Sequence, residues 1–153
     1  MTAPSDSAIL EAGPELVITR QFDAPRSLVF KAWTQPEHLV RWLGPKDFSA
    51  SAVRLDVRPG GAWSAVITSP EGKRYGMAGI YREIAPPERL VFTFAWDEDK
   101  AEQMLIALSF RDRDGKTEMT FRQTGFQSVE SRDSHRGGWN ECFDRLPAFL
   151  AQA

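Results

Sequence analysis

The sequence predicts an α+β fold in which a curved antiparallel sheet of seven strands wraps around a long C-terminal helix, with two short helices between the first and second strands. Seven runs of strand-like residues lie between residues 16 and 124, and their links are too short for parallel crossovers. Apolar residues then recur at i, i+3, i+4 and i+7 between residues 135 and 150, which is helical period. Because one helix must cover the whole sheet, we expect an apolar hollow between helix and sheet.

Length and composition predict one compact domain. The chain has 153 residues, of which 42% are hydrophobic, including 10 Phe, so it is not a disordered sequence. A chain of this size buries roughly 68–70% of its unfolded surface around one core. Residues 1–14 are rich in Ala, Ser and Pro, and we interpret them as a mobile tail that precedes a single domain at residues 15–151.

Charge and cysteine usage exclude several classes of partner. The formal net charge is -2 and the two signs are interspersed, which favours neither nucleic acid nor an anionic membrane. No apolar run approaches the ~20 residues of a membrane span, and the N-terminal residues lack the pattern of a signal peptide. The single cysteine, Cys142, allows no intrachain disulfide. We therefore expect a cytoplasmic protein, either a monomer or a homodimer.

The first elements are a strand and two short helices. Alternation predicts a strand from Leu16 to Phe22, and Pro25 favours the start of a helix that runs to about Trp33. The segment from Thr34 to Glu37 has the spacing of a capping box and predicts the start of a second helix. Gly44 and Pro45 end that helix.

Six further strands follow, separated by turn sequences. The apolar phase changes between Ala52 and Val53, which predicts a bulge in the second strand. Turn signals then occur at residues 59–61, 69–72, 86–87, 97–100 and 112–115. The last of these, Asp-Arg-Asp-Gly, is a hairpin signal. All neighbouring strands are expected to be antiparallel.

The C-terminal helix is expected to begin near Ser128, whose side chain can cap it. Its apolar stripe consists of Trp139, Cys142, Phe143, Leu146, Phe149 and Leu150. Pro147 lies within this stripe's span and removes one backbone hydrogen bond. We therefore expect a kink at Pro147 or an early end to the regular helix.

Aromatic and methionine side chains are the candidate ligand-binding residues. Four of them, Trp63, Tyr75, Tyr81 and Trp139, combine a large apolar body with one polar group, which suits a cavity wall. For these four, lining a cavity and ordinary packing are equally good explanations. Ordinary core packing is the favoured explanation for most of the others, because alternation alone places them on the concave face. The full predicted set is Trp63, Tyr75, Met77, Tyr81, Phe94, Trp96, Met104, His135 and Trp139.

The sequence offers little for catalysis or metal binding. No Asp, Glu, His or Cys lies in the concave-face runs, which argues against acid–base chemistry, so no catalytic residue is assigned. His135 lies one helical turn before Trp139 and is either solvated or a donor or base in the cavity, whereas His38 is interpreted as a surface residue. Two His and one Cys do not provide zinc-ligand spacing, and Cys142 is expected to be inert in the core. We predict no metal and no cofactor.

Four segments together carry a family resemblance. They are residues 30–42 (FKAWTQPEHLVRW), 57–63 (VRPGGAW), 86–91 (PPERLV) and 135–139 (HRGGW). With the predicted element order they resemble bacterial proteins similar to the activator of the 90-kDa heat-shock-protein ATPase (AHSA-type). That family lies within the SRPBCC superfamily, whose helix-grip fold is shared with START and birch-pollen-allergen (Bet v 1) proteins. The resemblance covers about Glu15 to Ala151.

The resemblance implies a helix-grip fold and leaves several functions open. Relatives bind apolar small molecules, protect cells from reactive metabolites in a stress response, or cyclise polyketides. The eukaryotic activator resembles this chain only in its C-terminal part. The expected function is binding of an apolar or aromatic small molecule in the cavity. The alternatives are a co-chaperone-like domain that binds a chaperone or another protein, and a polyketide-cyclase- or hydrolase-like enzyme.

Overall fold

A computed structural model describes residues 13–153, so most of the predicted tail at residues 1–14 lies outside the described residues. The element order is β1 (Leu16–Phe22), α2 (Arg26–Thr34), α3 (Pro36–Trp42), β2 (Ser49–Leu55), β3 (Ala62–Thr68), β4 (Arg74–Ala85), β5 (Arg89–Trp96), β6 (Asp99–Arg113), β7 (Lys116–Thr124) and α4 (Val129–Gln152). This order confirms the predicted helix-grip fold.

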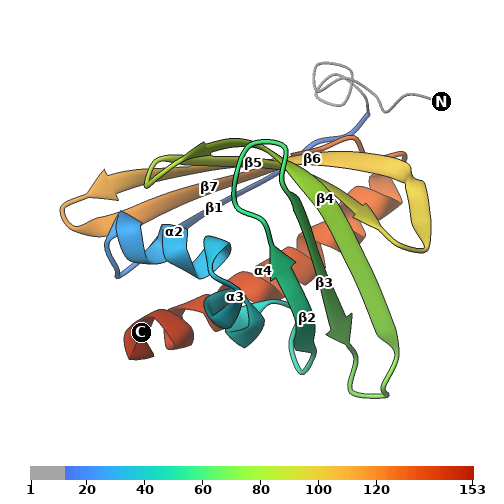
Figure 1. The fold of residues 1–153 in the computed structure, drawn as a ribbon, viewed down its shortest axis with the longest axis horizontal. Helices are drawn as coiled ribbons and strands as arrows, with labels where there is room; N and C mark the ends of the chain where they lie inside the picture. Colours follow the sequence, from blue (N-terminus) through green and yellow to red (C-terminus); the bar gives the residue numbers. More distant parts are fainter. Residues whose placement is uncertain (1–12) are drawn as a thin grey trace.

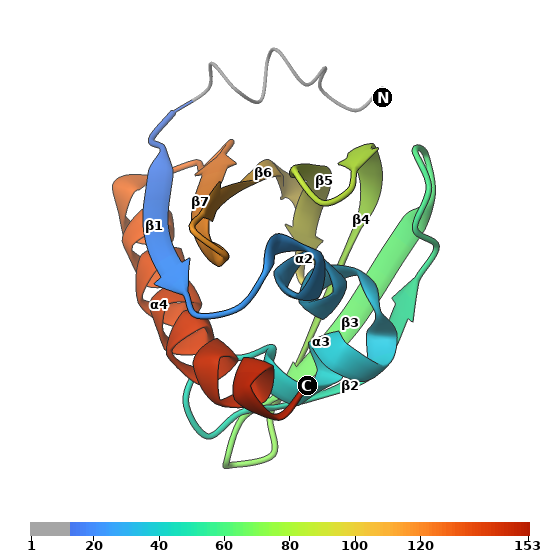
Figure 2. The same cartoon turned by 90° about the vertical axis from the view of Figure 1, so that its left-hand side faces the viewer.

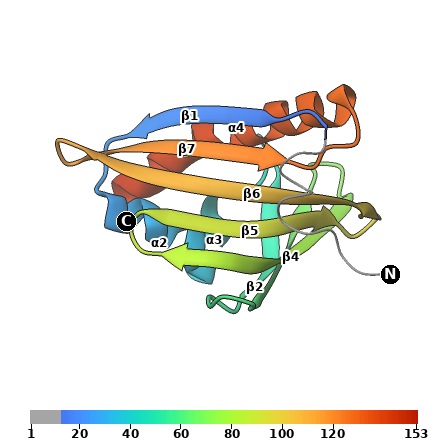
Figure 3. The same cartoon turned by 90° about the horizontal axis from the view of Figure 1, so that it is seen from above.

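The seven strands form one antiparallel sheet in the order β1-β7-β6-β5-β4-β3-β2. Figure 3 shows β1, β7, β6, β5 and β4 side by side, with α4 on the other side of the sheet from the viewer. Because β1 and β2 lie at opposite edges, the chain between them must cross the open end of the curved sheet. Helices α2 and α3 make that crossing (Figure 2), as the sequence predicted.

The predicted bulge in β2 is present. The register between β2 and β3 shifts between Ser51 and Arg54, and Ala52 has a positive φ of 50°. The extra residue bends β2, and this bend helps the edge of the sheet formed by β2 and β3 to curve toward the helices (Figure 1).

Two predicted turn details are wrong. Thr34 does not cap α3; it is the last residue of α2, and its hydroxyl donates to the Phe30 carbonyl (2.9 Å). Gln35 is the N-cap of α3 because the following proline, at the first helical position, favours an extended residue before it. The expected four-residue turn at 97–100 is shorter, since β6 already begins at Asp99.

Helix α4 is capped as predicted and, of the two alternatives at Pro147, does not take the early end. The Ser128 side chain accepts a hydrogen bond from the Ser131 amide (3.0 Å). The helix does not end early at Pro147, because it continues to Gln152. Pro147 is itself exposed, and its ring nitrogen leaves the carbonyl of Phe143 without its helical donor.

The apolar stripe of α4 packs against the sheet. Phe143 is fully buried, and its ring lies 5.4 Å from the ring of Phe121 on β7 and 6.0 Å from that of Trp33 on α2. Phe143 therefore joins the three layers that meet at the core: the sheet, α4 and the α2–α3 pair.

Phe143→Ala should lower the free energy of unfolding by about 3–5 kcal/mol, because the truncation leaves a cavity where three layers meet. Chemical denaturation measures this loss. Ala148→Gln, on the exposed side of the same helix, should change stability by less than about 0.5 kcal/mol. Equal effects of the two substitutions would contradict the packing of this stripe.

Candidate functional site

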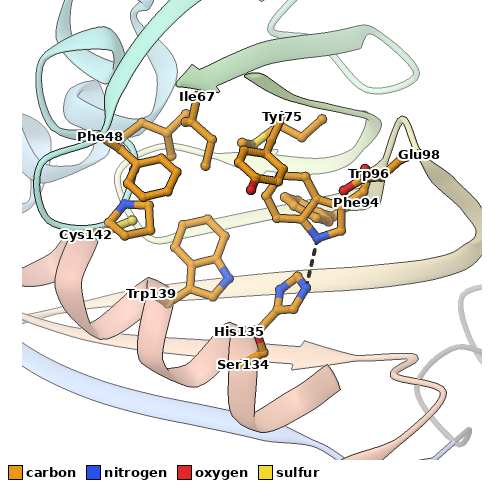
Figure 4. A pocket seen from close by; sticks show the side chains of 15 residues that line it. Phe48, Ile67, Tyr75, Phe94, Trp96, Glu98, Ser134, His135, Trp139 and Cys142 are labelled. Atoms are coloured by element: carbon orange, nitrogen blue, oxygen red, sulfur yellow. Dashed lines mark hydrogen bonds between the residues drawn. The ribbon is translucent and has the colours of Figure 1, made fainter. Parts of the chain in front are cut away.

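A cavity of about 290 Å³ lies between the concave face of the sheet and the N-terminal half of α4. Its walls come from the loop after α3, strands β3 to β5, the β5–β6 turn and α4 (Figure 4). The lining residues are Leu43, Gly44, Pro45, Phe48, Ile67, Tyr75, Met77, Phe94, Trp96, Glu98, Ser134, His135, Gly138, Trp139 and Cys142.

The structure brings six of the nine predicted site residues together around this cavity. Their contributions come from two places: β4 and β5 supply four, and α4 supplies two. These six residues are Tyr75, Met77, Phe94, Trp96, His135 and Trp139. The sequence had no signal for the part of the wall formed by residues 43–48, because that segment is a loop.

The other three predicted residues do not line the main cavity. Trp63 and Tyr81 border a separate void of about 20 Å³ and are buried in the core. The Trp63 indole donates to the Thr93 carbonyl (2.9 Å), so its polar group is already used between two strands. Met104 is fully buried, and its sulfur accepts from the Gln123 amide (3.3 Å).

A chain of polar contacts crosses the floor of the cavity. The indole of Trp96 donates to Nε2 of His135 (3.0 Å), and Nδ1 of His135 lies 3.4 Å from the amide nitrogen of Gln123. The oxygen of the same Gln123 amide accepts from the indole of Trp139 (3.0 Å). Gln123 is fully buried, and its polar atoms are satisfied at the oxygen by the Trp139 indole and at the nitrogen by the Met104 sulfur (3.3 Å). Gln123 was not among the predicted site residues, although its side chain orients Trp139.

His135 is held neutral in this environment. Burial lowers its pKa from 6.5 to about 4, opposed in part by the nearby charge of Glu102. An indole N–H can only donate, so Nε2 of His135 is an acceptor and the proton of the neutral ring resides on Nδ1. The Gln123 amide nitrogen is also a donor, so its 3.4 Å contact with Nδ1 is not a hydrogen bond. Protonation would cost the Trp96 hydrogen bond as well as the burial of a charge.

One titratable residue of the concave face was missed. Glu102 has the same strand phase as Met104 and is buried, with 7% exposure. Its carboxylate accepts from the Gln127 amide (2.8 Å) and from the Ser131 hydroxyl (3.1 Å). Glu102 therefore anchors the first turn of α4 to β6. Glu102 lies two residues before Met104, and this spacing alone predicts that both side chains point to the concave face. The acidic turn just before Glu102 made it look like part of a solvated loop.

Tyr75 carries a polar group that remains available in the cavity. Its hydroxyl makes no hydrogen bond within residues 13–153, and it points toward the side of the cavity formed by α4 (Figure 4). The indoles of Trp96 and Trp139 already donate to protein acceptors. A bound molecule would therefore find mostly apolar walls, the free hydroxyl of Tyr75, and the exposed side chains of Ser134 and Glu98.

The loop wall is fastened to α4. A guanidinium nitrogen of Arg145 donates to the Gly44 carbonyl (2.9 Å), and the Glu141 carboxylate accepts from the Lys46 amide (2.9 Å). Cys142 lies between these two residues in the helix, and burial raises the pKa of its thiol to about 12. Cys142 is thus a neutral apolar part of the wall.

His38 is not the surface residue that the sequence suggested. It is half-buried, and its ring packs edge-on against Phe149 at 5.2 Å. In the part of the chain that the structure describes, no group of three or more His, Cys, Asp or Glu side chains could hold a metal ion. No helix among residues 13–153 is long and apolar enough to span a membrane.

A sequence profile of the family described as activator of Hsp90 ATPase homolog 1-like protein matches residues 23–151. The chain belongs to this family. A search of the curated proteins finds no match.

Solved structures agree with the family assignment. The AHSA1 protein from Silicibacter pomeroyi is 25% identical, with a TM-score of 0.81 over 91% of this chain and 99% of that one. A protein from Nitrosomonas europaea is 26% identical, with a TM-score of 0.79 over 90% of this chain and 94% of that one. A protein from Rhodobacter sphaeroides is also 26% identical, with a TM-score of 0.78 over 92% and 97%.

The depressed pKa of His135 predicts a pH-dependent stability. Between pH 6.5 and about 4 the unfolded chain binds a proton at this side chain that the folded chain does not, so stability falls as the pH is lowered. The loss across this window is roughly 3 kcal/mol. Denaturation midpoints measured from pH 7 to pH 4 test it.

The control for this prediction is His135→Gln, which keeps an acceptor for the Trp96 indole and does not titrate. The variant should lose less stability than the wild type over the same window. Parallel pH curves for the two proteins would show that His135 is not buried as a neutral ring.

Proposed function

We propose that this chain binds an apolar or aromatic small molecule in the cavity between sheet and α4. The observation that carries the proposal is a mostly apolar cavity of about 290 Å³ in which the hydroxyl of Tyr75 makes no hydrogen bond to residues 13–153. Ligand sites in proteins are typically apolar hollows of this kind with few polar groups.

The state of the other polar groups supports binding over acid–base catalysis. Three lining residues, Glu98, His135 and Cys142, are of the type used as a base or nucleophile, and Glu98 lies exposed in the β5–β6 turn rather than in the interior. Burial moves the pKa of His135 down to about 4 and that of Cys142 up to about 12, so neither is poised near neutral pH. The cavity offers shape, aromatic contact and a hydrogen bond rather than proton transfer.

An apolar fluorescent probe such as an anilinonaphthalene should bind the folded protein at about one-to-one stoichiometry. A compound present at 100 times its dissociation constant should add about 2.7 kcal/mol of stability, because it binds only the folded state. Fluorescence titration and thermal shift over a panel of apolar and aromatic compounds measure both effects.

Tyr75→Phe tests the hydrogen bond. The substitution keeps the ring and removes the hydroxyl, so compounds that bond to it should lose about 1 kcal/mol of affinity. Tyr81→Phe is the matched control, because Tyr81 is buried at the small separate void and should leave affinity unchanged.

The outcome that would reject the proposal is a complete absence of saturable binding across the panel. If the same protein then captured a purified 90-kDa chaperone, the co-chaperone-like alternative would take its place.

A further inference from the structure

The walls of the cavity are unusually aromatic. Five aromatic side chains line it, and their rings form a connected series: Phe48 to Tyr75 (6.2 Å), Tyr75 to Trp96 (6.3 Å), Trp96 to Phe94 (5.2 Å) and Phe94 to Trp139 (6.3 Å). Adjacent rings are tilted or edge-on, so they present faces in several directions around the hollow. The face of an aromatic ring carries partial negative charge and attracts cations within about 6 Å of its centre.

The formal charge carried by the lining side chains has the same sign. No Lys or Arg is among the fifteen lining residues, and Glu98 in the β5–β6 turn is the one acidic side chain among them. The Glu98 carboxylate makes no ion pair or hydrogen bond within residues 13–153. Arg54, the cation of β2, lies at a depression lined by Thr93 and Ala95, away from this cavity.

The structure already contains one cation on this aromatic series. The ammonium nitrogen of Lys73 lies 4.9 Å from the ring centre of Tyr75. Lys73 is exposed and does not line the cavity, whereas the Tyr75 ring does. The contact shows that at least one ring of the wall is positioned to attract positive charge.

We propose that the cavity selects ligands that carry an ammonium group on an apolar or aromatic body. The cation would lie against the aromatic walls and near Glu98, and the apolar body would fill the interior. This inference rests on the proposed binding function and names the class of ligand. The proposed cavity binds a cationic amine at least as tightly as a neutral hydrocarbon and more tightly than an organic anion. An ordinary apolar cavity would bind the neutral hydrocarbon most tightly.

A matched pair of probes tests it. Benzyltrimethylammonium and neopentylbenzene have the same shape and differ in one atom, nitrogen for carbon, and therefore in charge. Water solvates the cation far better, so a merely apolar cavity would favour neopentylbenzene strongly. We expect the ammonium to bind the full-length protein at least as tightly as its isostere, measured by displacement of the fluorescent probe. Phenylacetate, an anion of similar size, should not displace it.

Three substitutions locate the source of the preference. Glu98→Gln keeps the shape of the rim and should weaken the ammonium roughly two- to five-fold at low salt without affecting neopentylbenzene. Glu71→Gln, an exposed change in the β3–β4 turn, is the control. Lys73→Met removes the competing cation and should raise ammonium affinity about two-fold. Phe48→Leu keeps an apolar wall and should weaken the ammonium more than the isostere.

The outcomes separate the two proposals. Neopentylbenzene binding more than ten-fold tighter than the ammonium, with no effect of Glu98→Gln, would overturn the ligand class and leave the binding function intact. Failure of both probes and of the whole compound panel would overturn the binding function and this inference with it.

Discussion

The structure depends on one geometric constraint, which is that a single helix must cover a sheet of seven strands. Seven strands spaced about 4.8 Å apart span roughly 29 Å, whereas a helix with its side chains is only about 10–12 Å wide. The sheet must therefore curve, and Figure 2 shows it curving around α4 with α2 and α3 in the open end. Large aromatic side chains fill most of what remains. The cavity is the part of this space that they do not fill.

The polar residues under the sheet follow from the same constraint. A curved sheet surrounds the helix on several sides, so indole and amide groups near α4 cannot reach bulk water and must bond to one another. The oxygen of Gln123 accepts a hydrogen bond from the Trp139 indole, and its nitrogen donates to the Met104 sulfur and lies next to Nδ1 of His135. The contacts also orient the rings of Trp96 and Trp139, so that aromatic surface rather than polar edges faces the hollow.

Alternation and turn residues predicted most of the fold. The first strand, Leu16–Phe22, has the predicted bounds, and the phase change at Ala52 marked a real bulge. The site was harder, because Trp63 and Tyr75 are equivalent in sequence: each is a large aromatic residue on an alternating strand. What separates them is the sheet itself, since the Trp63 indole enters the gap between β4 and β5 beside Gly79. No local pattern reports that contact.

The position of the cavity has a physical cause in α4 and the loop beside it. Gly138 takes the place of a side chain on the helix face toward Pro45, where an added Cβ would contact the proline ring at 3.7 Å. Arg145 and Glu141, further along the helix, hold the same loop by its backbone. Where the helix carries Phe143 and Leu146 the space is filled, and where it carries Gly138 it is open. The chain therefore uses one end of α4 to stabilise the core and the other end to shape the cavity.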